Sequence, residues 1–470
     1  MDHQVVERLV EISGNANAKT TVAQRLAYSY DATANFQAMP DIVLSPSSIE
    51  EVQEIVRVCS EYQIPIVSRG SGTNLAAGTT PTSGGVVLLF NRMNEILELD
   101  HENLTITVQP GVITQTINEV VEKSGLFYPP DPSSMSISTI GGNVSENSGG
   151  LRGLKYGVTR DYVKALKVVL PTGEVITTGG KLAKDVAGYD LTSLFVGSEG
   201  TLGVIVEIIL GLIPQPETKK TLLVFYNELE EAARTVSSII AAKIVPATLE
   251  FMDKGTIEAV ENFMHIGLPT DCEAMLLIEQ DGDPEVVEKD MALIHKLCLE
   301  HGATSIQVAQ SAEEAAELSL ARRVALSALA RMRPTTILED ATVPRSEISK
   351  MVKTIQEIAV KYDLLICTFG HAGDGNLHPT ILTDERDTEE MKRVESAFEE
   401  IFDRAIQLGG TITGEHGVGE MKSPYLEWKI GPEGMNVMRT IKTSLDPKNI
   451  MNPGKMFAKD TKKRIVVHHE

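Results

Sequence analysis

Apolar residues in the first part of the chain recur first at helical spacing and then in short runs. After Ser48, apolar positions repeat every three or four residues, which predicts a helix that begins with a capping box at Ser48. Short apolar runs at 64–67, 86–90 and 104–109 predict strands, and residues 114–124 predict a further helix. This alternation indicates a small α/β unit.

A second pattern follows Pro214. Strands and helices alternate from Thr221 to Val308 in the order strand–helix–strand, twice, which is typical of a ferredoxin-like fold. The periodicity then predicts four helices, at 312–331, 344–362, 388–408 and 432–445. The charged tail from Ala458 is expected to fray.

Three glycine-rich stretches interrupt the first pattern. The strand at 64–67 runs into RGSGTN at 69–74, where Gly70 and Gly72 match the first half of the dinucleotide-binding fingerprint GxGxxG. The fingerprint is not complete, because Leu75 stands in place of its third glycine and no long helix follows. Exposed main-chain N–H groups there still suit a diphosphate, although a plain surface turn is the alternative. Residues 129–157 and 197–203 are also rich in Gly, Ser and Asn. Structureless loops of such length usually bind something, so one large polyphosphate ligand is expected along this domain.

The segment at 364–382 predicts a strand, a tight glycine turn and a second strand, with His371 and His378 flanking the turn. A later glycine-rich turn carries Glu415 and His416. Two histidines and a glutamate, with a fourth position open, have the general form of a catalytic metal site. The alternative is that these histidines only bind the backbone of their hairpin.

Together, PDPSS, STIGGNVSENSGGLRGLKYG, GSEGTLGVI, GHAGDGNLHP and GEHGVG resemble the FAD-linked D-2-hydroxy acid dehydrogenases of the vanillyl-alcohol-oxidase type. The resemblance covers about residues 40 to 457. It implies an α+β protein with a two-subdomain FAD-binding domain of the vanillyl-alcohol-oxidase (PCMH) type at 1–215, a ferredoxin-like cap (substrate) domain at 216–420, and a return segment to the FAD domain at 421–470. The implied cofactor-binding residues are Arg69, Gly70, Ser71, Gly72, Thr73, Asn74, Pro132, Ser133, Thr139, Gly142, Asn143, Ser148, Gly149, Tyr156, Glu199, Gly200, Gly203, Val204 and Asn452.

The same resemblance implies a reaction and its residues. His371, His378 and Glu415 would hold a divalent metal (Zn, Mn or Fe), and His416 would act as the acid/base. Arg322 would bind the carboxylate of a small 2-hydroxy acid such as D-lactate or glycolate. Many relatives tether FAD through a histidine in the first loop, but no histidine or cysteine lies between Arg69 and Phe90, so non-covalent FAD is expected.

Composition limits the partners. The formal net charge of −22 argues against nucleic-acid binding. The four cysteines form no CxxC pair, so an iron–sulfur cluster within the chain is not expected. The electrons are therefore expected to leave for a separate protein, an iron–sulfur subunit or an electron-transferring flavoprotein. Neither a signal peptide nor a transmembrane segment is visible, which favours a cytoplasmic protein. Two alternatives remain open: a metal-independent flavoenzyme of the same superfamily, and a flavoprotein electron-transfer subunit.

Overall fold

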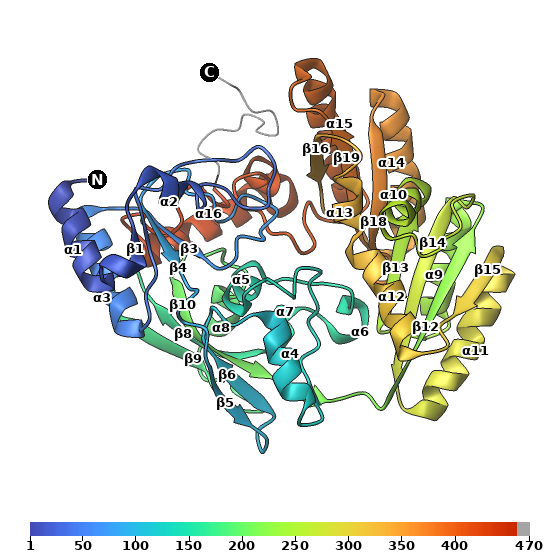
Figure 1. The fold of residues 1–470 in the computed structure, drawn as a ribbon, viewed down its shortest axis with the longest axis horizontal. Coiled ribbons are helices and arrows are strands. Elements are labelled where there is room, and N and C mark those ends of the chain that lie inside the picture. The colour runs from blue at the N-terminus through green and yellow to red at the C-terminus, as the bar shows by residue number, and fades with distance from the viewer. Residues whose placement is uncertain (458–470) are drawn as a thin grey trace. The chain divides into compact units, whose positions relative to one another are not determined.

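The computed structural model describes residues 1–457, which form two compact units (Figure 1). Among the described residues, unit 1 contains Met1–Ser148, Val158–Gln215 and residues 415–457, and unit 2 contains Gly149–Gly157 and Pro216–Gly414. Unlike the expected division, the short stretch Gly149–Gly157 belongs to unit 2, and the return to unit 1 begins at Glu415. The tail predicted from Ala458 lies outside the described residues.

Unit 1 contains two larger sheets and a small two-stranded one. The first sheet has the order β1-β2-β4-β3, the second β5-β6-β10-β8-β9, and β11 pairs with β7. The strands are β1 (Ala18–Lys19), β2 (Ile42–Leu44), β3 (Ile66–Arg69), β4 (Val86–Leu89), β5 (Ile96–Asp100), β6 (Thr105–Val108), β7 (Leu126–Phe127), β8 (Val163–Val169), β9 (Val175–Gly179), β10 (Val204–Gly211) and β11 (Ile213–Pro214). The helices are α1 (His3–Ser13), α2 (Val22–Leu26), α3 (Ile49–Tyr62), α4 (Thr114–Glu122), α5 (Ile140–Glu146), α7 (Thr159–Tyr162), α8 (Leu191–Phe195) and α16 (Leu426–Leu445).

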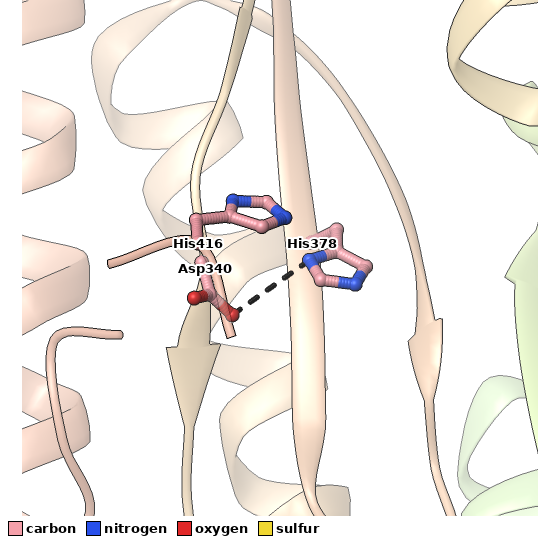
Figure 2. Close-up of side chains that lie close together, drawn as sticks. All are labelled: Asp340, His378 and His416. Carbon is pink, nitrogen blue, oxygen red and sulfur yellow. Dashed lines mark ion pairs between the residues drawn. The ribbon is translucent and has the colours of Figure 1, made fainter. Parts of the chain in front are cut away.

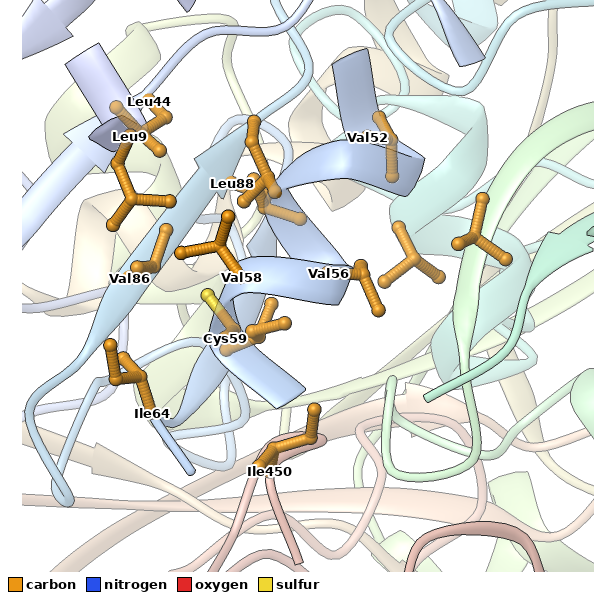
Figure 3. Packing of buried hydrophobic residues seen from close by; sticks show 14 of the residues in the cluster. Leu9, Leu44, Val52, Val56, Val58, Cys59, Ile64, Val86, Leu88 and Ile450 are labelled. Carbon is orange, nitrogen blue, oxygen red and sulfur yellow. The ribbon is translucent and has the colours of Figure 1, made fainter. Parts of the chain in front are cut away.

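Helix α3 shows how the apolar pattern builds the first core. Its apolar face packs with β2, β4 and helix α1 around residues such as Val56, Cys59 and Leu88, all fully buried (Figure 3). Ser48 caps the helix by accepting a hydrogen bond from the Glu51 N–H at 3.2 Å. The predicted capping box is only half formed, because the Glu51 side chain accepts from the main chain and hydroxyl of Ser47 instead.

The glycine-rich stretch at 129–157 is not structureless, contrary to expectation. It contains α5, and the short helix α6 (Gly153–Tyr156) lies in its last part. Helix α5 begins after Thr139 and ends at Asn147, whose φ of 56° closes the helix in a left-handed conformation. Glycines at the start of a helix weaken the periodic signal, so sequence reasoning missed this element.

Unit 2 is built on an eight-stranded sheet of order β15-β12-β14-β13-β18-β19-β16, with β17 also pairing to β19. Its first four strands have the ferredoxin-like order, and all their pairings are antiparallel. The strands are β12 (Thr218–Tyr226), β13 (Thr248–Asp253), β14 (Ala274–Gly282), β15 (Ala303–Val308), β16 (Thr335–Leu338), β17 (Ala341–Thr342), β18 (Leu365–His371) and β19 (Asn376–Thr383).

Helices cover both faces of this sheet (Figure 1). Those of unit 2 are α9 (Leu229–Ala241), α10 (Lys254–Met264), α11 (Pro284–Glu300), α12 (Ala312–Arg323), α13 (Ala325–Leu329), α14 (Ile348–Tyr362) and α15 (Thr388–Gln407). Side chains of α10, α12 and α13 share one core with Leu223, Met252 and Phe369 of the sheet. The single helix predicted at 312–331 is broken at Val324, which places the end of α12 against this face. Among residues 1–457, no helix is long and apolar enough to cross a membrane.

Candidate functional site

A groove in unit 1 is the first candidate binding site. It lies between helix α5 and the loops that follow β3 and α8, and the space among its lining residues, part of it open to solvent, is about 540 Å³. Its lining residues are Ser68, Arg69, Gly70, Gly78, Thr79, Phe90, Pro110, Thr139, Gly141, Gly142, Ser145, Glu146, Glu199, Gly200, Gly203, Ile205 and Asn452.

Glycines make this groove possible. A Cβ on Gly70 would lie 1.9 Å from the Thr139 hydroxyl oxygen, and one on Gly141 would lie 2.6 Å from Pro110 Cβ. Gly70 therefore lets its loop pack directly against the Thr139 side chain, and Gly141 lets α5 pack directly against Pro110. Such loops present N–H groups at close range, which fits the diphosphate of a dinucleotide.

Of the expected cofactor-binding residues, eight line the groove: Arg69, Gly70, Thr139, Gly142, Glu199, Gly200, Gly203 and Asn452. Others shape the loops instead. The Asn74 side chain accepts from the N–H groups of Ala76 and Gly78, and Asn143 donates to Thr114 at 2.6 Å. Ser71, Gly72, Thr73, Pro132, Ser133, Ser148 and Val204 are not among the lining residues.

Two expected residues, Gly149 and Tyr156, belong to unit 2. The Tyr156 hydroxyl lies 2.9 Å from both carboxylate oxygens of Asp281, and Lys155 forms an ion pair with the same carboxylate. The structure therefore gives Tyr156 a partner within unit 2, which sequence reasoning did not foresee.

Glu146 is a buried acid in the groove that sequence reasoning missed. Its Oε1 accepts from Asn74 at 2.7 Å, while Oε2 has no hydrogen-bond partner among the described residues. Burial first, and then the nearby Glu199, raise the pKa of Glu146 well above its usual range. Burial also raises the pKa of Glu199, although the Val418 and Gly419 N–H groups, each 2.7 Å away, act in the opposite direction.

The return segment closes the groove within unit 1. The Asn452 side chain donates to the carbonyl oxygens of Gly78 and Glu199, at 2.9 and 2.7 Å. Lys455 is buried and donates to the Thr80 carbonyl at 2.8 Å. These bonds hold the glycine loops of unit 1 to residues 452–455.

The histidine hairpin of unit 2 is the second candidate site. Strands β18 and β19 pair with His378 opposite Phe369 and His371 opposite Asn376. In this register both imidazoles project from the same face of the sheet. Their ring centroids lie 5.2 Å apart, and both residues are buried. The hairpin thus brings two expected metal ligands together.

Each histidine has a buried carboxylate close to it, one from strand β13 and one from the connection between β16 and β17, which sequence reasoning missed. Glu250 of β13 lies 2.7 Å from His371 Nδ1. Asp340 lies 3.9 Å from His378 Nδ1 (Figure 2). The Glu250 carboxylate at hydrogen-bond distance fixes the tautomer of His371 and leaves its Nε2 to a metal, so the donor set fits a divalent ion.

Arg322, expected to bind a substrate carboxylate, lies in the same unit. It is 2 % exposed, its Nε is 2.6 Å from Glu250 Oε2, and its guanidinium stacks 4.6 Å from the centre of the Phe369 ring. Its Nη2 has no hydrogen-bond partner among the described residues. A buried guanidinium N–H without a partner is costly, which indicates a site for an anion.

Glu415 and His416 follow the end of unit 2. The Gly414 N–H and the Thr413 hydroxyl both donate to Asp340 Oδ2 at 2.7 Å. Asp340 also accepts from Asn376, so one carboxylate joins the hairpin to the segment that leads to Glu415.

Comparisons with known proteins identify the family of the chain. Residues 40–179 match the FAD binding domain model, and residues 215–456 match the model of the FAD linked oxidases, C-terminal domain. The chain is 65% identical over 462 residues to the glycolate oxidase subunit GlcD of Bacillus subtilis, covering 98% of both chains. It is 36% identical to a D-lactate dehydrogenase of Anaerostipes hadrus, covering 92% of this chain and 93% of that protein.

Solved structures show the same fold. The structure of p-cresol methylhydroxylase matches with a TM-score of 0.80 at 19% identity, covering 97% of this chain and 96% of the other. The glycine-lined groove and the α+β fold define a flavin-dependent oxidoreductase of the vanillyl-alcohol-oxidase type. The chain belongs to the FAD linked oxidases.

Proposed function

We propose that this enzyme oxidises a small D-2-hydroxy acid, D-lactate or glycolate, to the 2-keto acid and passes the electrons to a separate protein. The names of its relatives, glycolate oxidase subunit and D-lactate dehydrogenase, support this substrate class. The observation that carries the proposal is the buried group of His371, His378 and Arg322 on one face of the unit 2 sheet. That group offers metal ligands and a carboxylate-binding cation together.

The FAD groove and the hairpin supply different parts of the reaction. Non-covalently bound FAD would accept the hydride from C2 of the substrate. A divalent ion (Zn, Mn or Fe) held by His371, His378 and Glu415 would lower the pKa of the substrate hydroxyl. His/His/carboxylate ligation suits all three metals.

The protein's own residues orient the substrate and move the proton. Arg322 binds the substrate carboxylate through its buried Nη2, which fixes the position of C2. His416 takes the hydroxyl proton, because a neutral imidazole is a competent base near neutral pH. Phe369 and the surrounding core exclude water from the guanidinium.

The electrons then leave through a partner. Cys59, Cys272, Cys298 and Cys367 are all buried and unpaired, so they offer no ligand set for an iron–sulfur cluster. An iron–sulfur subunit or an electron-transferring flavoprotein is the expected acceptor, in the cytoplasm.

A substrate panel tests the proposal. Protein reconstituted with FAD and mixed anaerobically with D- and L-hydroxy acids should lose its yellow colour with D-lactate or glycolate, and not with L-lactate. Acid denaturation should release all of the flavin if it is bound non-covalently. A flavin that no 2-hydroxy acid reduces would contradict the proposed activity.

A further inference from the structure

Glu250 has a role that the sequence motifs do not suggest. It lies on β13, 121 residues before His371, and it is 1 % exposed. Its carboxylate has two partners at once, with Oε1 2.7 Å from His371 Nδ1 and Oε2 2.6 Å from Arg322 Nε. One buried side chain thus joins a proposed metal ligand to the proposed substrate-binding arginine.

The chemistry of these contacts requires a carboxylate. A guanidinium has no acceptor atom, so Arg322 can only donate. His371 must also donate from Nδ1 if its Nε2 is to bind a metal. The ion pair to Arg322 Nε and the hydrogen bond to His371 Nδ1 use separate oxygens, and among side chains of this length only glutamate provides two that carry charge.

We propose that Glu250 is a positioning residue that couples the metal site to the substrate-carboxylate site, by orienting His371 and Arg322 with its two oxygens. This inference rests on the proposed function above. It makes metal affinity and substrate binding depend on one residue that touches neither ligand. It also explains a buried glutamate on a strand whose neighbours Leu249 and Phe251 are apolar and buried.

Glu250→Gln is the test, because the amide keeps the size of the side chain but has only one acceptor oxygen. If that oxygen serves His371, the amide NH₂ faces the Arg322 Nε–H, and if it serves Arg322, the NH₂ faces His371. Metal affinity, measured on the FAD-loaded protein by competition with a chelator, should fall about 10- to 100-fold. At saturating metal, the KM for the hydroxy acid should rise more than kcat falls.

A matched control lies on the adjacent strand. Glu279 of β14 is also buried and accepts from Lys219, Thr221 and Ser319, at 3.0, 3.1 and 2.7 Å. Glu279→Gln removes a buried carboxylate from the same face without touching His371. It should leave metal affinity unchanged, so an equal loss in both variants would show a general loss of structure and overturn the inference.

Two further variants keep the test decisive. Glu250→Asp retains both acceptors on a side chain that is one methylene shorter, so it reaches only one partner and should also weaken metal binding. In Arg322→Met/Glu250→Gln, the single amide oxygen is free to serve His371. This double variant should bind metal more tightly than Glu250→Gln alone.

The outcomes separate the two proposals. Wild-type metal affinity in both Glu250→Gln and Glu250→Asp would refute the coupling role, even in an enzyme that oxidises hydroxy acids. A metal affinity that depends on Glu250, in a protein that oxidises no hydroxy acid, would support the coupling role and refute the proposed substrate.

Discussion

The candidate site of unit 1 is formed mainly by main-chain groups, whereas the candidate site of unit 2 is formed by side chains. In unit 1 the groove is lined by glycines such as Gly70 and Gly141, whose main chains approach other loops closely. In unit 2 the site consists of side chains, and His371 and Arg322 share the carboxylate of Glu250. A large cofactor can be held by many main-chain groups, whereas a metal and a small acid need a few side chains, each fixed by a partner.

We expect the largest effect from His378→Ala, which tests whether metal binding depends on unit 2 and FAD binding on unit 1. Loss of one ligand should empty the metal site and lower turnover by about 10³-fold, since metal assistance contributes several kcal/mol. The FAD content should stay at the wild-type level, because the groove belongs to unit 1. Metal analysis and flavin absorbance on the same sample check both points. Unchanged metal content would contradict the ligand assignment.

A buried lysine holds the glycine loops of unit 1 in place. Lys455 Nζ bonds to the Thr80 carbonyl and pairs with Glu420 at 3.2 Å. Lys455→Met removes the ion pair to Glu420 and the hydrogen bond to the Thr80 carbonyl, both buried, which should lower the free energy of unfolding by about 3–5 kcal/mol. The control is the exposed Lys448, whose Nζ donates to the Ser60 carbonyl at 2.7 Å. Lys448→Met should change the free energy of unfolding by less than about 0.5 kcal/mol. Equal effects in denaturant titrations would refute this role.

Gly72→Ala tests the importance of the main chain in the groove. Gly72 has φ of +74°, and a Cβ there would lie 2.2 Å from Arg69 Nη2, so Arg69 must move within the groove. The strain of about 1–2 kcal/mol should weaken FAD binding about tenfold. Gly188 has a similar φ of +88° but no heavy atom within 4 Å of such a Cβ. Gly188→Ala should therefore keep wild-type FAD affinity in flavin titrations, and a loss in both variants would contradict the assignment.

The smallest expected effect is a pH dependence at Glu146. Burial and Glu199 raise the pKa of Glu146, so the folded protein holds this proton to higher pH than the unfolded chain does. Stability is therefore lost as the pH rises above the ordinary glutamate range, and Glu146→Gln removes that loss. The variant should gain more in Tm over the wild type at about pH 8 than at about pH 5. A gain that is independent of pH would show that Glu146 stays ionised.

The proposed metal ligands could be predicted from the sequence more readily than the carboxylates that lie beside them. The turn between His371 and His378 has strong local signals, so the hairpin and its shared face followed from the sequence. Glu250 and Asp340 carry no local signal, because the fold of the sheet and its connections brings them to the histidines from 121 and 38 residues away. Helix α5 was missed because its local signal is misleading. Its glycines allow close packing at the groove, but glycine has a low helix propensity and no apolar side chain, so the sequence shows no helical pattern there.

The most direct measurement is anaerobic reduction of the bound FAD by D-lactate or glycolate, before and after the metal is removed with a chelator. We expect rapid bleaching in the metal-loaded enzyme, loss of bleaching after chelation with FAD still bound, and recovery when Zn, Mn or Fe is returned. Bleaching that is equally fast with and without metal would refute a role for the metal in this oxidation.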